Sequence, residues 1–388
     1  MLLNTYYNGI EIHRREKIIL AKFLAPHRVL STCRAVGGMQ EGLEYVYNHQ
    51  SCEPIGHTVG LPESMLYDPQ EYRRLICGIH KIPAEKAATM GTAANMRNAA
   101  IVSETFRELE VVSICTGGVE TNGGRVGDPA SVYEHEKGFE KLGREEPNPE
   151  HGTINTMVFI NKELTPGSMV RVVVTATEAK TAVLQELAVN SRYSDGLATG
   201  TGTDQILVAS MCETGVALTS AGKHSKLGEL IGKSVFRAVK RTLAMQNGLT
   251  PERQRSSLIH LERFGATEET MIAEISRYLM PETQRLFRKN FIGVDRDSVV
   301  VAAVAACVHL RDKIVWGILP ESCWSEILSS HAAQIAAAVS GKYDHLPNYR
   351  ARLAPLQGTT TNAAFLELIY HALALGFREK WDIYDRAP

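Results

Sequence analysis

The chain has 388 residues, of which 44% are hydrophobic and 22% are charged, and this composition is typical of a globular protein rather than a disordered one. Its 42 basic and 43 acidic residues leave a formal net charge of −1. Such a balance argues against a nucleic-acid-binding protein and against attraction to an anionic membrane, so we expect a small or neutral ligand.

The cysteines and the apolar runs of the sequence indicate in which cellular compartment the protein functions. Seven scattered cysteines with no CxxC pair argue against a disulfide framework and a zinc ribbon, and the histidines show no metal-ligand spacing. The N-terminal stretch MLLNTYYNGIEIHRREK lacks the apolar core of a signal peptide. The longest apolar run, 299–308, is shorter than the roughly 20 residues of a membrane-spanning helix. We therefore expect a cytoplasmic protein without a metal site or membrane insertion.

Short apolar runs bounded by turn residues predict buried strands at 111–116, 156–160 and 205–210. The polar stretch 134–152 contains two prolines and is predicted to be a surface loop. No repeat is visible along the chain.

A helix is predicted to begin after Thr165, a residue suited to the N-cap, with Pro166 at its first position. The β-branched run 172–174 favours an alternative, a strand that ends at Thr175 and is followed by a shorter helix. Because the apolar stripe continues without a break in phase to Leu187, we favour one long helix.

This helix would place a lysine on its apolar face. At about 100° per residue, Lys180 falls within the stripe, whereas Glu178 points to the opposite side. A lysine in such a place either extends its ammonium group to water or acts as a base or hydrogen-bond donor. Glu178 by itself is most simply a solvated helix charge.

Helical patterns dominate after about residue 245, in stretches such as TEETMIAEISRYLMPETQRLF. We therefore predict a first domain over 1–247 and a helical C-terminal extension over 248–388. The predicted fold class is mixed α/β (α+β), a layered sheet with packed helices plus that extension.

Three polar segments are candidates for a site. The loop TGTGTD at 199–204 lacks the lysine of a phosphate loop, and its Asp204 either forms a turn or faces a cleft. Thr153 is either a nucleophile, with Asn155 as an oxyanion donor, or an ordinary strand-entry threonine. The glycine-rich stretch 115–129 is either a loop or a ligand-binding surface.

Taken together, several stretches resemble the CbiZ family of adenosylcobinamide amidohydrolases over about residues 20 to 245. The stretches are STCRAVGG (31–38), TMGTAANM (89–96), CTGG…GDPA (115–130), GTINTMVFIN (152–161), TATEAK (175–180), GTGTDQILVA (200–209) and KLGELIGKSV (226–235). The resemblance implies hydrolysis of the amide between the aminopropanol arm and the corrin ring, which gives adenosylcobyric acid. The corrinoid is then the substrate, and no cofactor is expected. Cys33, Arg34 and the helical tail depart from the family pattern.

Amide hydrolysis needs a nucleophile, an oxyanion donor and an acid for the leaving amine. Our hypothesis is that Asp204 or Glu178 activates water, that Lys180 donates to the oxyanion or to the leaving amine, and that the 152–155 and 200–203 loops bind the amide. The alternative makes Thr153 a covalent nucleophile with Lys180 as its base. The candidate substrate-binding residues are Asn155, Thr201, Thr203, Gly117, Gly118, Asn122, Gly37 and Gly38. A non-catalytic corrinoid carrier or sensor is the alternative function. The need for the adenosyl ligand, the role of the tail and assembly into a homo-oligomer stay open.

Overall fold

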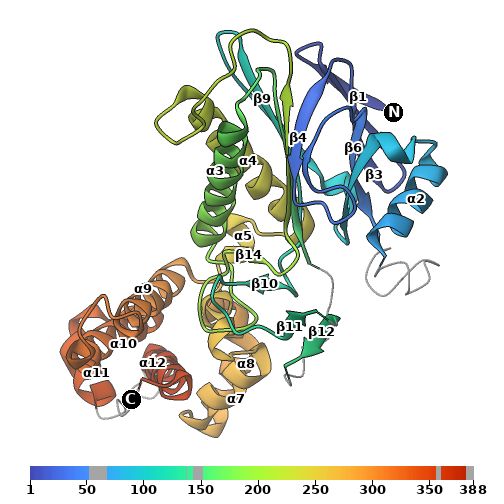
Figure 1. Cartoon of the computed structure of the whole chain (residues 1–388). Helices are drawn as coiled ribbons and strands as arrows, with labels where there is room; N and C mark the ends of the chain where they lie inside the picture. The colour runs from blue at the N-terminus through green and yellow to red at the C-terminus, as the bar shows by residue number, and fades with distance from the viewer. Residues whose placement is uncertain (52–67, 137, 143–151, 355–359, 382–388) are drawn as a thin grey trace, which may run out of the picture. The chain divides into compact units, whose positions relative to one another are not determined.

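The computed structural model describes residues 1–51, 68–136, 138–142, 152–354 and 360–381. The chain divides into two compact units, Met1–Leu249 and Thr250–Pro388 (Figure 1). The first contains sheets and helices and the second contains helices, which confirms the predicted mixed α+β class with a helical C-terminal region.

Two sheets form the centre of the first unit. The larger has the order β5 (Gly38–Gln40), β4 (His27–Ser31), β15 (Gln205–Met211), β13 (Ile154–Ile160), β9 (Leu109–Gly117) and β8 (Ala100–Phe106). The smaller has the order β1 (Leu2–Tyr6), β2 (Ile10–Arg15), β3 (Ile18–Phe23), β6 (Tyr45–Gln50) and β7 (Ala87–Thr92). In the larger sheet β13 and β15 are parallel, and in the smaller sheet β6 and β7 are parallel.

Both faces of the larger sheet are buried. On β13, Met157 and Phe159 pack in a core shared with the smaller sheet, whereas Val158 and Ile160 pack against helices on the other face. Helix α2 (Pro69–His80) covers the outer face of the smaller sheet. The resulting layers, helix, sheet, sheet, helices, explain why the strands are continuous apolar runs rather than alternating ones. The three predicted strands are confirmed as β9, β13 and β15.

The helices on the larger sheet are α3 (Pro166–Glu186) and α4 (Lys226–Asn247). The single long helix predicted after Thr165 is confirmed, since the Thr165 side chain accepts a hydrogen bond from Ser168 N and no strand interrupts residues 172–174. Helix α4 ends at Asn247 and is capped by Gly248, whose φ of 62° is accessible to glycine at little cost.

The predicted surface loop at 134–152 is wrong in its first part. Strands β11 (Val132–His135) and β12 (Gly138–Lys141) pair as an exposed antiparallel hairpin, and β-branched and aromatic residues such as Val132, Tyr133 and Phe139 favour strands despite the surrounding charges. Residues 143–151 of the prediction lie outside the described part of the chain.

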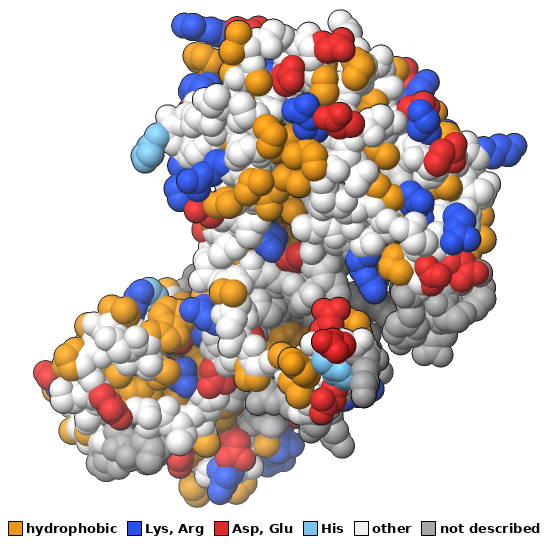
Figure 2. All heavy atoms as spheres, in the orientation of Figure 1, with side chains coloured by type: hydrophobic (Ala, Val, Ile, Leu, Met, Phe, Trp, Pro, Cys, Tyr) orange, Lys and Arg blue, Asp and Glu red, His pale blue; other side chains and the backbone are white. Residues whose placement is uncertain are grey.

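The second unit is built from helices that share one apolar core. Its α-helices are α5 (Pro251–Gln254), α6 (Ser257–Leu261), α7 (Glu268–Arg277), α8 (Pro281–Asp295), α9 (Ser298–Val315), α10 (Trp324–Ser340), α11 (Leu346–Leu353) and α12 (Asn362–Trp381). Among the described residues, no helix has the length and apolar character that crossing a membrane requires. Figure 2 shows acidic and basic side chains interspersed on the face that it presents, in keeping with the balanced charge.

Candidate functional site

The polar segments meet at one edge of the larger sheet. The parallel strands β13 and β15 begin there, with Asn155 beside Gln205 in the register. Strand β9 runs antiparallel to β13 and ends there, with Thr116 beside Asn155. The order of the strands therefore brings the segments 115–118, 152–155 and 200–205 together although they are far apart in the sequence.

Asp204 is the centre of this edge. Its Oδ1 accepts hydrogen bonds from Ile154 N at 2.9 Å and from Thr201 Oγ1 at 2.6 Å. Its Oδ2 accepts from Thr201 N at 3.1 Å and from Lys180 Nζ. A carboxylate has about four acceptor positions, so the described contacts fill all of them.

Lys180 reaches this carboxylate from α3. Its side chain is 13% exposed and that of Asp204 is 16% exposed, so the ion pair is largely shielded from water. Asp204 is the one hydrogen-bond partner of Nζ among the described residues, and an ammonium group has three N–H donors. Two donors of Lys180 are therefore available to a ligand.

Gly200 leaves the space that the ion pair occupies. A Cβ atom at this position would lie 2.7 Å from Lys180 Nζ and would also overlap Asp204 Oδ2. Strand β14 (Gly200–Thr201) pairs with β10 (Gly123–Gly124), which fixes the backbone here. The first glycine of the GTGTD motif, Gly200, thus has a steric explanation.

Two threonines join the loops to each other. Thr153 Oγ1 donates to the Thr203 carbonyl at 2.7 Å, and Thr203 Oγ1 donates to the Gly152 carbonyl at 3.1 Å. The hydroxyl hydrogen of Thr153 is therefore directed to a backbone oxygen rather than to a side-chain base.

Residues of the segment 115–129 hydrogen-bond to the loop at 152–153. Asn122 Nδ2 donates to the Gly152 carbonyl at 2.8 Å, and Asn122 Oδ1 accepts from Tyr193 OH at 2.6 Å. Gly118 N donates to the Thr153 carbonyl at 3.0 Å. Gly117 packs so closely on α4 that a Cβ atom there would lie 2.9 Å from Leu243 Cδ2.

Asn155 faces the smaller sheet. Its Nδ2 donates to Asn48 Oδ1 and to the Gly91 carbonyl, both at 2.9 Å. Because both N–H hydrogens are used inside the protein, the geometry does not favour Asn155 as an oxyanion donor. Asn48 in turn donates to Thr116 Oγ1 at 2.7 Å, so the amide pair links the two sheets.

Three predicted residues stand apart from the ion pair. Glu178 accepts from Lys223 Nζ at 2.9 Å, and its side chain is 45% exposed on the other face of α3. Gly38 begins β5, two strands away from β15, and Gly37 directly precedes it; neither hydrogen-bonds to Lys180 or Asp204 in the described structure. These positions can at most contact a ligand that extends beyond the ion pair.

Neither a thiolate nor a bound metal is indicated at this edge. Burial raises the pKa of Cys33 to about 11 and that of Cys115 to about 12, so both thiols stay protonated near neutral pH. Within the ranges that the structure describes, no three His, Cys, Asp or Glu side chains gather as a metal site would require.

Sequence reasoning missed Asn48, Gly91 and Gln205. Asn48 and Gly91 come from the smaller sheet, and no local pattern connects them with GTIN. Gln205 directly follows Asp204, and its place beside Asn155 depends on which strands pair. Only the pairing of β13 with β15 reveals its position.

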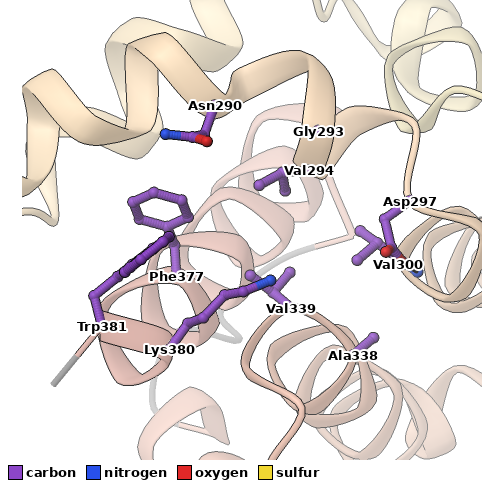
Figure 3. Close-up of a pocket in the computed structure, with 10 residues that line it drawn as sticks. All are labelled: Asn290, Gly293, Val294, Asp297, Val300, Ala338, Val339, Phe377, Lys380 and Trp381. Atoms are coloured by element: carbon purple, nitrogen blue, oxygen red, sulfur yellow. Dashed lines mark hydrogen bonds between the residues drawn. The ribbon is translucent and has the colours of Figure 1, made fainter. Parts of the chain in front are cut away.

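The helical unit contains a cavity of its own, with a volume of about 140 Å³ (Figure 3). Its walls are formed by Asn290, Gly293, Val294, Asp297, Val300, Ala338, Val339, Phe377, Lys380 and Trp381. Pockets for drug-sized ligands usually measure about 300–1,000 Å³, so this one is too small for a corrinoid. None of its residues belongs to the predicted site.

Comparison with known proteins agrees with the sequence pattern. The sequence model of the CbiZ family, adenosylcobinamide amidohydrolase, matches residues 3–251. A protein of Methanocaldococcus jannaschii named only as uncharacterized, MJ1613, is 36% identical over 236 residues, which are 60% of this chain and 87% of that protein. The matched residues include all three polar segments and leave the helical unit almost entirely outside.

Proposed function

The chain belongs to the CbiZ family of adenosylcobinamide amidohydrolases, and on that premise we propose that it hydrolyses the amide between the aminopropanol arm and the corrin ring of adenosylcobinamide. Water adds to the amide carbon, the C–N bond breaks, and the nitrogen leaves with a proton. The products are adenosylcobyric acid and aminopropanol. We assign this reaction to the first unit, in the cytoplasm.

The convergence of three segments on the Lys180–Asp204 pair is the observation that supports a reaction at this edge. After its bond to Asp204, Lys180 has two N–H donors without a partner among the described residues, and the ion pair is largely shielded from water. A cation in such a place stabilises the oxyanion that develops on the amide oxygen and supplies a proton to the leaving amine. We therefore assign Lys180 as the catalytic acid and electrophile.

Asp204 takes a different role from the one that the sequence suggested first. Four donors already occupy its oxygens, so no acceptor position is left for the proton of an attacking water. Its contacts instead fix the direction of the Lys180 side chain and the spacing of the 152–155 and 200–204 loops. We propose that Asp204 is a positioning residue.

Water is the nucleophile that the contacts favour. Thr153 as a nucleophile would need a base to take its hydrogen, whereas that hydrogen points to the Thr203 carbonyl. Rapid quenching of a single turnover, with enzyme in excess over substrate, followed by mass spectrometry of the intact chain distinguishes the two, because direct attack by water leaves the chain without added mass at every time point. A covalent adduct on Thr153, trapped and detected by mass spectrometry, would contradict direct attack.

The test of the function is the release of aminopropanol from adenosylcobinamide by the purified full chain. Lys180→Met should abolish most of this release, whereas Lys240→Met removes the exposed ion pair of Lys240 with Glu186 and should leave it unchanged. If wild-type chain binds adenosylcobinamide but releases no aminopropanol, the alternative function, a corrinoid carrier or sensor, replaces the enzyme.

A further inference from the structure

Two amide oxygens at the edge described above have no hydrogen-bond partner in the described part of the chain. They are Asn155 Oδ1 and Gln205 Oε1, and both atoms are buried. Asn155 as a whole is only 1% exposed. A buried acceptor without a donor costs about 1–3 kcal/mol, so such a pair needs an explanation.

The orientation of the Asn155 amide follows from its neighbours. The Gly91 carbonyl lies 2.9 Å from Nδ2, and a carbonyl oxygen can only accept. The nitrogen must therefore face Gly91, which leaves Oδ1 directed elsewhere. Rotation of the amide by 180° would remove both described hydrogen bonds of this side chain.

The two oxygens belong to one side of the sheet. Asn155 and Gln205 are paired in the register of parallel strands, and residues so paired point to the same face. The face is the one toward the smaller sheet, because Met157 and Leu207, two positions further along each strand, lie in the core between the sheets. Neighbouring strands are about 4.8 Å apart, a spacing that the two N–H bonds of one N–H₂ group can bridge.

The same strand ends carry the ion pair toward the opposite face. Asp204 precedes Gln205, and it meets Lys180 of α3, which packs on the other side of the sheet. A ligand that lies across the strand ends therefore encounters a cationic donor on one side and neutral acceptors on the other. Gln205 is partly exposed as a residue although its Oε1 is buried, whereas Asn155 is buried throughout, so Gln205 is the member of the pair that lies nearer to solvent.

Resting on the proposed function, we propose that Asn155 Oδ1 and Gln205 Oε1 form a subsite that binds the N–H₂ group of a carboxamide on the substrate. Both acceptors are neutral, which suits an amide nitrogen, and corrinoids carry carboxamide side chains around the ring. Binding there supplies the missing donors and places the corrin with its scissile amide toward Lys180. Asn155 and Gln205 are specificity-determining residues in this proposal.

The test measures corrinoid binding and amide hydrolysis separately on the full chain. Gln205→Met keeps the length of the side chain and removes the acceptor. The Kd for adenosylcobinamide should rise about tenfold, as expected for one lost buried hydrogen bond, and kcat should change by less than about threefold. The thermal midpoint should not fall, because an apolar group replaces an oxygen that has no hydrogen-bond partner in the described structure.

Two further variants and a second ligand complete the design. Gln205→Glu keeps an acceptor and should bind the substrate more tightly than Gln205→Met does. Gln334→Met, on the exposed side of α10, is the matched control and should change nothing. A cobyrinate alkyl ester, which carries esters in place of carboxamides, should bind equally to wild type and Gln205→Met.

Three results would overturn the subsite. They are an unchanged Kd in Gln205→Met with an unchanged thermal midpoint, an unchanged Kd with a lower thermal midpoint, which would instead indicate a buried structural water, and an equal loss of affinity for the ester. Wild type that fails to bind adenosylcobinamide overturns the subsite and the proposed function together. Wild type that binds without hydrolysis overturns the proposed function alone, because the effect on Kd still decides the subsite.

Discussion

Lys180 Nζ donates a hydrogen bond to Asp204 Oδ2 across 24 positions of sequence, from a helix on the sheet to a loop at its edge. The lysine belongs to the TEAK segment and the aspartate to GTGTD, and Asp204 also holds Ile154 of GTIN. One carboxylate thus connects all three segments that characterise this sequence. Replacing Lys180 should therefore affect mainly the chemistry, whereas replacing Asp204 should affect mainly the geometry of the loops.

Replacement of Lys180 should separate catalysis from binding. Lys180→Met removes the proposed acid and should lower kcat by about 10²–10⁴-fold with a small change in KM. Asp204→Asn keeps the size of the side chain but loses charge and should lower kcat less, because Lys180 stays nearby. Steady-state kinetics of both variants checks this, and equal kcat in Lys180→Met and wild type would remove Lys180 from the mechanism.

Gly200→Ala tests the space beside the ion pair. The added methyl group would lie 2.7 Å from Lys180 Nζ, so the lysine must move and the pair must separate. We expect a loss of stability of about 1–3 kcal/mol together with lower kcat. Gly232→Ala in α4 is the control, since its methyl group meets open space and a helical alanine should stabilise by about 0.5–1 kcal/mol. Similar unfolding curves and activities for the two variants would contradict the steric argument.

Much of the larger sheet and of α3 was predictable from sequence, because burial of a face requires apolar residues at a spacing that the sequence itself shows. Strands covered on both faces become continuous apolar runs, and the stripe of α3 places Lys180 toward the core. The same periodicity placed Glu178 on the exposed side, where it pairs with Lys223. The spacing of apolar residues lies within one segment, so it can be interpreted without knowing which other elements that segment contacts.

The partners themselves were not predictable. Asn48 and Asn155 are 107 positions apart and meet only because two sheets stack. The hairpin of β11 and β12 was mistaken for a loop because its charged residues mask the strand preference of Tyr133 and Phe139. The contact of Asn48 with Asn155 depends on long-range stacking of the sheets, which composition within a short window does not record, whereas the hairpin pairs residues at most nine positions apart.

Low pH should destabilise the first unit through His27. The ring is 2% exposed, stacks on Phe23, and hydrogen-bonds through Nδ1 to the Ala25 carbonyl and through Nε2 to Tyr7 OH. Burial lowers the pKa of His27 from 6.5 to about 4, against a smaller opposing effect of the Ala25 carbonyl. The unfolded chain therefore binds a proton at a higher pH than the folded chain. The stabilisation is complete above about pH 6.5 and is lost as the pH falls toward 4, with about 2 kcal/mol lost at pH 5.

Hydrogen exchange of amides in β2, β3 and β4 at pH 7 and pH 5 measures this loss of stability in the first unit, separately from the second. His27→Gln removes the titrating group. Between pH 7 and pH 5 its free energy of unfolding should fall by about 2 kcal/mol less than that of wild type, although the variant is less stable at pH 7. The same pH dependence in both proteins would assign the effect to other groups.

In the second unit, Asp312 should contribute strongly to stability because it is 5% exposed and receives a hydrogen bond from Arg263. A second guanidinium, that of Arg311, lies 3.7 Å from its other oxygen. Asp312→Ala leaves buried positive charge without this carboxylate, so we expect a loss of about 3–5 kcal/mol. Glu274→Ala, which breaks the exposed pair with Arg277, should cost at most about 1 kcal/mol.

Tryptophan fluorescence isolates this effect, because all three tryptophans, Trp316, Trp324 and Trp381, belong to the second unit. The urea midpoint followed by fluorescence should fall in Asp312→Ala, whereas the hydrogen exchange of β13 and β15 in the first unit should keep its wild-type rate.

A chain that ends at Leu249 tests whether the first unit folds and functions without the helical unit. Because the first unit has its own cores between its sheets and helices, this shorter chain should fold and retain the release of aminopropanol. Loss of β13 protection in either variant would show that the first unit depends on the helices beyond residue 249.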